Sequence, residues 1–192
     1  MKKFLAFVLA LIMFAMLAGC GAFQKGFEEA LDEAVKEEAG AMDASEVVLP
    51  EEGYAEGRIG TTFRTAFFDF CIEDVDSCES YEGYTPAEGM QLIDVTITVK
   101  NTFGEELPMF NSDFQIQWHD LGDKDEDFGN GVILNGSKTV MPEEYTQKRA
   151  ETVTYHIIYE APAQAKEFSV SYLEHYEDDT TGDVFFCFFE KA

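Results

Sequence analysis

The densest group of candidate ligands for a metal ion is the acidic run from Asp120 to Asn130. Aspartates occupy positions 120, 123, 125 and 127, and a calcium loop begins with carboxylates at such alternate positions. Counted from Asp123, the sixth position of that loop needs glycine and the twelfth glutamate, but the chain has Phe128 and Leu134 there. Asp123, Asp125 and Asp127 are therefore weak candidate ligands, and we favour a solvated acidic loop.

The first twenty residues have the pattern of an export signal. Met1-Lys2-Lys3 precedes a charge-free apolar run, Phe4 to Ala18, which is shorter than the roughly 20 residues that span a bilayer. A charged start, a short apolar run and small residues describe a signal peptide. The run ends Leu17-Ala18-Gly19-Cys20, which resembles the lipobox of bacterial lipoproteins. The resemblance implies that residues 1–19 are removed and that Cys20, the new N-terminus, carries acyl chains such as palmitate. An ordinary signal peptide with a cysteine there by chance is the alternative.

Three cysteines, Cys71, Cys78 and Cys187, remain once Cys20 carries lipid. An exported protein lies in a compartment that permits disulfides, but three is an odd number of thiols. Three arrangements stay open: a Cys71–Cys78 bridge across a tight reversal, a Cys71–Cys187 bridge between adjacent first and last strands, or three buried thiols. No histidine lies near these cysteines in the sequence, so a catalytic thiol is not expected.

Motifs for enzyme chemistry are missing from the sequence. His119, His156 and His175 are scattered without a metal-ligand spacing, and His156 is expected to point outward from its strand. The chain has neither a Gly-rich phosphate loop nor a nucleophile elbow. We therefore expect no enzyme activity and no cofactor, and rank an enzyme behind the non-catalytic readings.

Acidic residues dominate the composition. Thirty-eight Asp and Glu face thirteen Lys and Arg, for a net charge of −25. Nucleic-acid binding needs clustered cations to neutralise phosphates, so we exclude it. The charge also repels anionic headgroups, so attachment to the membrane is expected through the lipid on Cys20. A further partner, an envelope protein or ligand, is expected without being identified.

Residues 20–57 are expected to join the anchor to the globular part. Ala22 to Ala39 has apolar residues at helical spacing and predicts a short amphipathic helix. It could lie on the domain, pair with a partner or act as a spacer, and we favour a spacer because short isolated helices are marginal in water. Gly40 to Arg58 lacks a sustained period and predicts an acidic linker. One domain is then expected over residues 58–192.

Strands are expected throughout that domain. From Gln91 to Asn101, branched apolar residues alternate with polar ones, and a period of two places the branched side chains on one buried face of a central strand. Similar patterns predict strands over residues 63–72, 114–118, 153–159, 168–172 and 184–189. With no convincing helix between them, they favour an all-β antiparallel sandwich over a closed barrel.

Four segments also carry a family resemblance. They are Pro86-Ala87-Glu88-Gly89 before Asp94 to Asn101, Ser112-Asp113-Phe114, Pro142 ahead of Glu151-Thr152-Val153, and Tyr159-Glu160-Ala161-Pro162. Over roughly residues 58–172 the chain resembles the telokin-like, immunoglobulin-fold domain of Gram-positive lipoproteins, a domain of unknown function. Ala150 departs from it, because the family often has glycine there. The resemblance implies an immunoglobulin-like sandwich, an extracellular membrane-anchored location and no catalytic residues.

These observations predict a lipoprotein on the extracellular face of the cell membrane. Its sandwich would be a non-enzymatic binding or accessory module of the envelope. The alternative is a calcium-stabilised module in which the loop Asp120–Asn130 is the working part.

Overall fold

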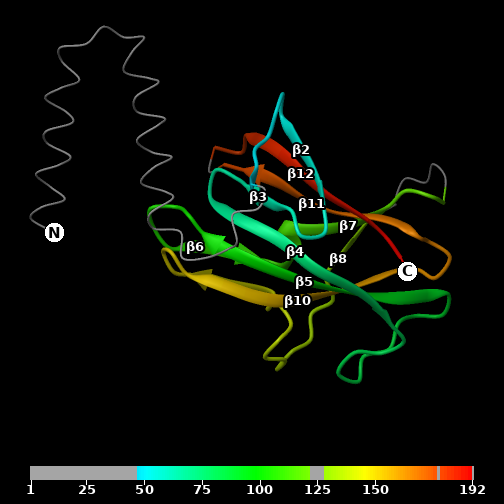
Figure 1. The fold of residues 1–192 in the computed structure, drawn as a ribbon. Helices are drawn as coiled ribbons and strands as arrows, with labels where there is room; N and C mark the ends of the chain where they lie inside the picture. Colours follow the sequence, from blue (N-terminus) through cyan, green and yellow to red (C-terminus); the bar gives the residue numbers. More distant parts are fainter. Residues whose placement is uncertain (1–46, 122–127, 177, 192) are drawn as a thin grey trace, which may run out of the picture. The chain divides into compact units, whose positions relative to one another are not determined.

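The computed structural model describes residues 47–121, 128–176 and 178–191, which form strands and one short 3₁₀ helix (Figure 1). The signal peptide, Cys20, the predicted amphipathic helix and Asp123, Asp125 and Asp127 lie outside these ranges. The elements are β1 (Val47–Val48), β2 (Tyr54–Arg58), β3 (Thr62–Arg64), β4 (Phe68–Cys78), β5 (Met90–Asn101), β6 (Leu107–Phe110), η1 (Asn111–Asp113), β7 (Phe114–Trp118), β8 (Phe128–Asn130), β9 (Glu144–Gln147), β10 (Thr152–Pro162), β11 (Glu167–His175) and β12 (Thr181–Glu190).

Two five-stranded sheets make up the sandwich. The first sheet has the order β1-β3-β4-β5-β10 and the second has the order β2-β12-β11-β7-β8, while β6 and β9 form a small separate pair. Inward side chains of both sheets merge into one hydrophobic core. The all-β sandwich predicted from alternation is therefore confirmed.

The predicted central strand is β5, which pairs antiparallel with β4 on one side and β10 on the other. Its alternate residues Ile93, Val95, Ile97 and Val99 are at most 1% exposed and pack in the core. Aromatic rings from both sheets fill the space beside them, as where the ring of Phe70 lies 5.5 Å from that of Phe114. Alternation in β5 thus marks the buried face correctly.

The first two strands correct the predicted domain boundary. β1 pairs parallel with β3, and β2 pairs parallel with β12, although both lie in the segment predicted as linker and the sheets were expected to be antiparallel throughout. No hairpin joins either pair, so nothing in the connection forces an antiparallel arrangement. The sandwich therefore also includes strands from residues 47–58, which sequence pattern missed because β1 is too short and β2 too polar to show alternation.

The strand predicted over residues 63–72 is in fact two, β3 and β4. Between them Thr65 Oγ1 accepts hydrogen bonds from the backbone N–H groups of Phe67 (3.1 Å) and Phe68 (3.0 Å). Such a side-chain turn reverses the chain, and it leaves Ala66 exposed instead of facing the core. Apolar residues continue through the turn, so their pattern hides it.

Three short strands also differ from expectation. β8 forms in a stretch predicted as loop, and β6 and β9 pair where no strands were predicted. β6 contains Pro108, which lacks the N–H group of a regular strand residue and is tolerated at an edge.

The outer faces of the two sheets differ in what packs against them. On the first sheet, Leu92, Val140 and Ile158 form a second apolar cluster, against which Tyr81, Tyr84, Val132 and Leu134 pack from neighbouring loops. The second sheet presents the surface described below.

Candidate functional site

The cysteines in the described part of the chain are free thiols. Cys71 and Cys78 lie on the same strand, β4, and an extended strand separates residues this far apart by on the order of 20 Å. The Cys71–Cys78 bridge is therefore wrong. Cys187, in the core on β12, is not bonded to Cys71 either. All three thiols are free, and Cys71 and Cys187 are buried while Cys78 is half-buried.

Burial also makes two of these thiols unreactive. It raises the pKa of Cys71 to about 11 and that of Cys187 to about 12. Both side chains stay protonated near neutral pH, and a protonated thiol is a poor nucleophile and metal ligand.

The acidic loop is described only at its two ends. The Asp120 carboxylate accepts hydrogen bonds from the backbone N–H of Lys166 at 3.2 and 3.0 Å. Asn130 Oδ1 accepts one from Gln115 Nε2 at 3.2 Å. Among the described residues, no three His, Cys, Asp or Glu side chains are grouped as metal ligands. Both described ends of the loop are thus engaged within the protein.

Two of the histidines lie on opposite outer faces. His156 Nδ1 is 2.7 Å from Asp94 Oδ1 on the first sheet, with its side chain partly exposed as predicted. His119 Nε2 is 3.0 Å from Ser169 Oγ on the second sheet. Each imidazole has a local polar partner.

The outer face of the second sheet carries aromatic side chains that meet solvent. Along β12, Phe185, Cys187 and Phe189 are buried, whereas Phe186 and Phe188 between them point outward and are partly exposed. We call this surface the aromatic face. It consists of the outward-facing residues Tyr54, Glu56, Arg58, Gln115, Gln117, His119, Phe128, Asn130, Ser169, Ser171, Leu173, Val184, Phe186 and Phe188.

Strand register arranges the centre of the aromatic face in two rows. From β2 to β8, one row is Arg58, Phe188, Ser169, Gln117 and Phe128. The next is Glu56, Phe186, Ser171, Gln115 and Asn130. A column of phenyl rings on β12 and a column of amides on β7 therefore flank two small serines on β11.

Contacts within the sheet hold the phenyl rings in place. The rings of Phe186 and Phe188 are 5.8 Å apart and nearly parallel, at 24°. The Arg58 guanidinium lies 5.8 Å from the centre of the Phe188 ring, and the His119 ring lies 5.6 Å from it. Phe188 is thus positioned from both sides, which lowers the entropy lost when a ligand binds.

Charge lies around the aromatic face rather than at its centre: Glu190 and Glu167 point outward in the row beyond Phe188 and Ser169. In the two rows, Glu56 and Arg58 carry charge, and both belong to the edge strand β2. The row positions on β12, β11, β7 and β8 are uncharged, in a chain with thirty-eight acids and thirteen bases. The centre of this surface is therefore far less acidic than the chain as a whole.

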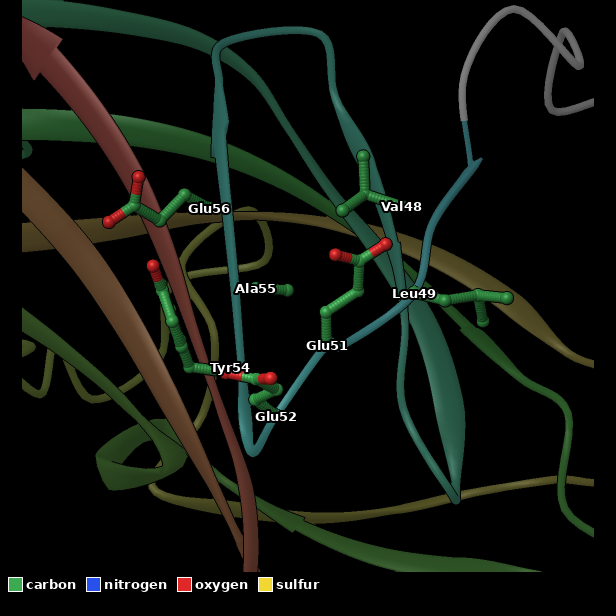
Figure 2. Close-up of a pocket in the computed structure, with 7 residues that line it drawn as sticks. All are labelled: Val48, Leu49, Glu51, Glu52, Tyr54, Ala55 and Glu56. Carbon is green, nitrogen blue, oxygen red and sulfur yellow. The ribbon is translucent and has the colours of Figure 1, made fainter.

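A pocket of about 370 Å³ adjoins the aromatic face where β2 begins. Figure 2 shows the side chains of Tyr54 and Glu56 projecting to the same side of β2, with Glu51 reaching from the preceding segment. The lining residues are Val48, Leu49, Glu51, Glu52, Tyr54, Ala55 and Glu56. Three carboxylates without a basic neighbour in that set disfavour an anionic ligand.

The sequence signal for the aromatic face was the uninterrupted apolar run from Val184 to Phe189. A strand with one wet face alternates polar and apolar residues, whereas an unbroken run predicts two apolar faces. The run predicts an aromatic strand over residues 184–189, but the pattern does not show what its second face contacts. Phe186 and Phe188 were missed for that reason.

No helix in the described ranges is both long enough and apolar enough to cross a membrane. No protein-family model and no curated protein matches this chain.

Three solved structures show a similar arrangement of strands. The ycdA protein of Bacillus subtilis subsp. subtilis str. 168, provisionally assigned as a lipoprotein, matches with TM-score 0.49 and 16% identity over 65% of this chain and 37% of that one. An uncharacterized β-sandwich protein of Clostridium difficile 630 matches with TM-score 0.44 and 14% identity, over 72% and 96% of the two chains. The yjhA protein of Bacillus subtilis matches with TM-score 0.48 and 16% identity, over 60% and 81%. This chain thus spans little more than a third of the ycdA protein.

Proposed function

We propose that this protein is a lipid-anchored, non-enzymatic module on the extracellular face of the membrane that binds an envelope component through its aromatic face. The observation that carries the proposal is the outward pair Phe186 and Phe188, set in an uncharged stretch of a strongly acidic chain. Apolar rings left in water forgo the free energy of burial, so a contiguous set of them is typical of a binding surface.

The sequence supports the location. The box Leu17 to Cys20 provides a lipid attachment point, and two or three acyl chains anchor a protein stably. The resemblance to the telokin-like, immunoglobulin-fold domain of lipoproteins supports the same location.

The chemistry of the described residues supports a module without catalytic activity. The buried thiols of Cys71 and Cys187 have raised pKa values. The Ser169 hydroxyl that His119 contacts is fully buried, out of reach of a substrate, and His156 contacts the Asp94 carboxylate. The calcium alternative rests on the aspartate spacing alone, and Asp120 is already engaged by Lys166.

The test is binding to cell walls isolated from the cells that make the protein and freed of membrane by detergent. Full-length protein in the same detergent is mixed with these walls, and the fraction that sediments is measured. Phe186→Ala with Phe188→Ala is expected to lower that fraction strongly. Phe103→Ala removes another partly exposed ring, in the segment between β5 and β6, and is expected to leave it unchanged. Equal sedimentation of wild type and the double variant would overturn the proposal.

A further inference from the structure

We infer that the aromatic face binds a neutral, β-linked polysaccharide chain. This inference rests on the proposed function and names the chemistry of its ligand. In β-linked glucose or N-acetylglucosamine polymers the ring substituents are equatorial, so each sugar presents two flat faces made of C–H groups. Those faces pack against aromatic rings, while the hydroxyl groups around the rim need hydrogen-bond partners.

Both requirements are met within the two rows. Phe186 and Phe188 supply the rings on β12. Gln115 and Gln117 supply planar amides on β7, which lies two strands away and hence about 10 Å across the sheet. A chain of a few sugar rings laid across the strands reaches both columns.

The serines between these columns favour an extended ligand over a small one. Ser169 and Ser171 are 0% and 8% exposed, and the Ser169 hydroxyl contacts His119. They add no projecting side chain between the phenyl and amide columns. A polymer can therefore lie over β11 and touch both columns at once.

The charges on and near the aromatic face exclude several classes of ligand. The centre of the aromatic face lacks the cations that an anionic polymer needs, and the acidic pocket beside Tyr54 repels one. Carboxylates lie at its border, on Glu56, Glu167 and Glu190, whereas the phenyl, serine and amide columns offer none with which a basic partner could pair. A second copy of this chain brings another charge of −25, which opposes self-association. A neutral ligand meets none of these penalties.

The probes are amorphous cellulose and chitin, with carboxymethyl-cellulose as the matched anionic control on the same backbone. Full-length protein is kept in a polyoxyethylene detergent, because maltoside and glucoside detergents carry sugar headgroups that would compete. Bound protein is measured as a function of polysaccharide concentration. We expect saturable retention on cellulose, chitin or both, and weaker retention on carboxymethyl-cellulose. Failure to bind either neutral polymer overturns the inference.

Two variants test whether the rings themselves carry the binding. Phe186→Ala with Phe188→Ala is expected to weaken retention about tenfold or more, since two aromatic contacts are lost. Phe186→Leu with Phe188→Leu keeps apolar bulk but removes the rings, and it is expected to weaken retention similarly while its melting temperature stays near that of the wild type. Phe103→Ala should bind normally. Retention of the leucine variant at the wild-type level would contradict ring stacking.

Protease treatment of the cell walls separates this inference from the proposed function. If wall binding requires Phe186 and Phe188 but disappears after protease digestion, and neither neutral polymer is bound, the partner is a protein. The proposed function then stands and the glycan inference is wrong. If wall binding survives digestion and cellulose or chitin retains the protein, both stand.

Discussion

At the scale of single residues, burial decides which cysteine can react. Cys71 and Cys187 are 4% and 0% exposed, and burial raises the pKa of each thiol to about 11 and about 12. Burial also raises the pKa of Cys78, but this thiol is only half-buried and can be reached by a reagent. At pH 8 a thiol reagent is therefore expected to modify Cys78 first, and the other two only as the protein unfolds. Absorbance of the released reagent, with and without urea, measures this. Cys78→Ser should abolish the fast phase, and a fast phase that persists in that variant would contradict the assignment.

Glu174 is a buried carboxylate that joins two turns. It is 2% exposed and accepts hydrogen bonds from the backbone N–H groups of Ala66 (2.7 Å) and Asp183 (3.2 Å) and from the Tyr176 hydroxyl (3.0 Å). Glu174→Ala removes the acceptor of three partly buried hydrogen bonds, so we expect the free energy of unfolding to fall by about 1.5–3 kcal/mol. Urea unfolding measures the change.

The control for Glu174 is Glu167→Ala, on the exposed start of the same strand β11. That substitution is expected to change the free energy of unfolding by no more than about 0.5 kcal/mol. Equal losses in the two variants would mean that Glu174 does not hold the turns together.

Residue types could be read from the sequence, but their partners could not. The spacing of Cys71 and Cys78 does not show that one strand contains both. The chain reversal nearest to them comes before Cys71, at Thr65. Nor does the sequence distinguish buried Glu174 from the many acids that face water. Contacts between distant segments settle both cases, and these depend on the whole fold.

At the scale of elements, β5 offers a test of register. Ile97 is fully buried, and Ile97→Ala is expected to lower the free energy of unfolding by about 2–5 kcal/mol. Thr98 faces the other side, where its hydroxyl lies 2.9 Å from that of Thr154, so Thr98→Ala should cost about 0.5–1.5 kcal/mol. Comparable losses in urea unfolding would contradict the register.

The strands with one apolar and one polar face could be predicted from the sequence. β5, β7, β10 and β11 alternate because one side packs in the core and the other does not. β1 and β2 escaped prediction because tertiary pairing with β3 and β12, rather than local pattern, makes them strands. β12 was predicted as a strand, but both of its faces are apolar, so the sequence did not show which of its aromatic residues point outward.

At the scale of the whole molecule, the proposed location depends on one residue. Cys20→Ala removes the thiol that would carry the lipid, so the protein is expected to leave the membrane fraction. Fractionation after washing without detergent measures this. Persistence of the variant in the membrane pellet, as unprocessed precursor or otherwise, would count against lipid anchoring.

The response to calcium is the sharpest test between a binding module and a calcium-stabilised one. Extracellular calcium modules bind at roughly 10⁻⁴ to 10⁻³ M. At about 1 mM free calcium such a site would stabilise the fold by about 0.4–1.4 kcal/mol, because ligand binding adds RT ln(1 + [L]/Kd). For a domain of this size the melting temperature would rise by about 1 to 6 °C.

A charge of −25 complicates that measurement, since any divalent cation screens repulsion among the carboxylates. Magnesium is therefore the control, because it screens equally but prefers a tighter octahedral site. We expect calcium and magnesium to raise the melting temperature alike, and Asp123→Asn with Asp125→Asn to leave the shift unchanged. A calcium-selective shift that this double substitution abolishes would instead make the loop Asp120–Asn130 the functional site, because screening by itself does not distinguish two ions of equal charge.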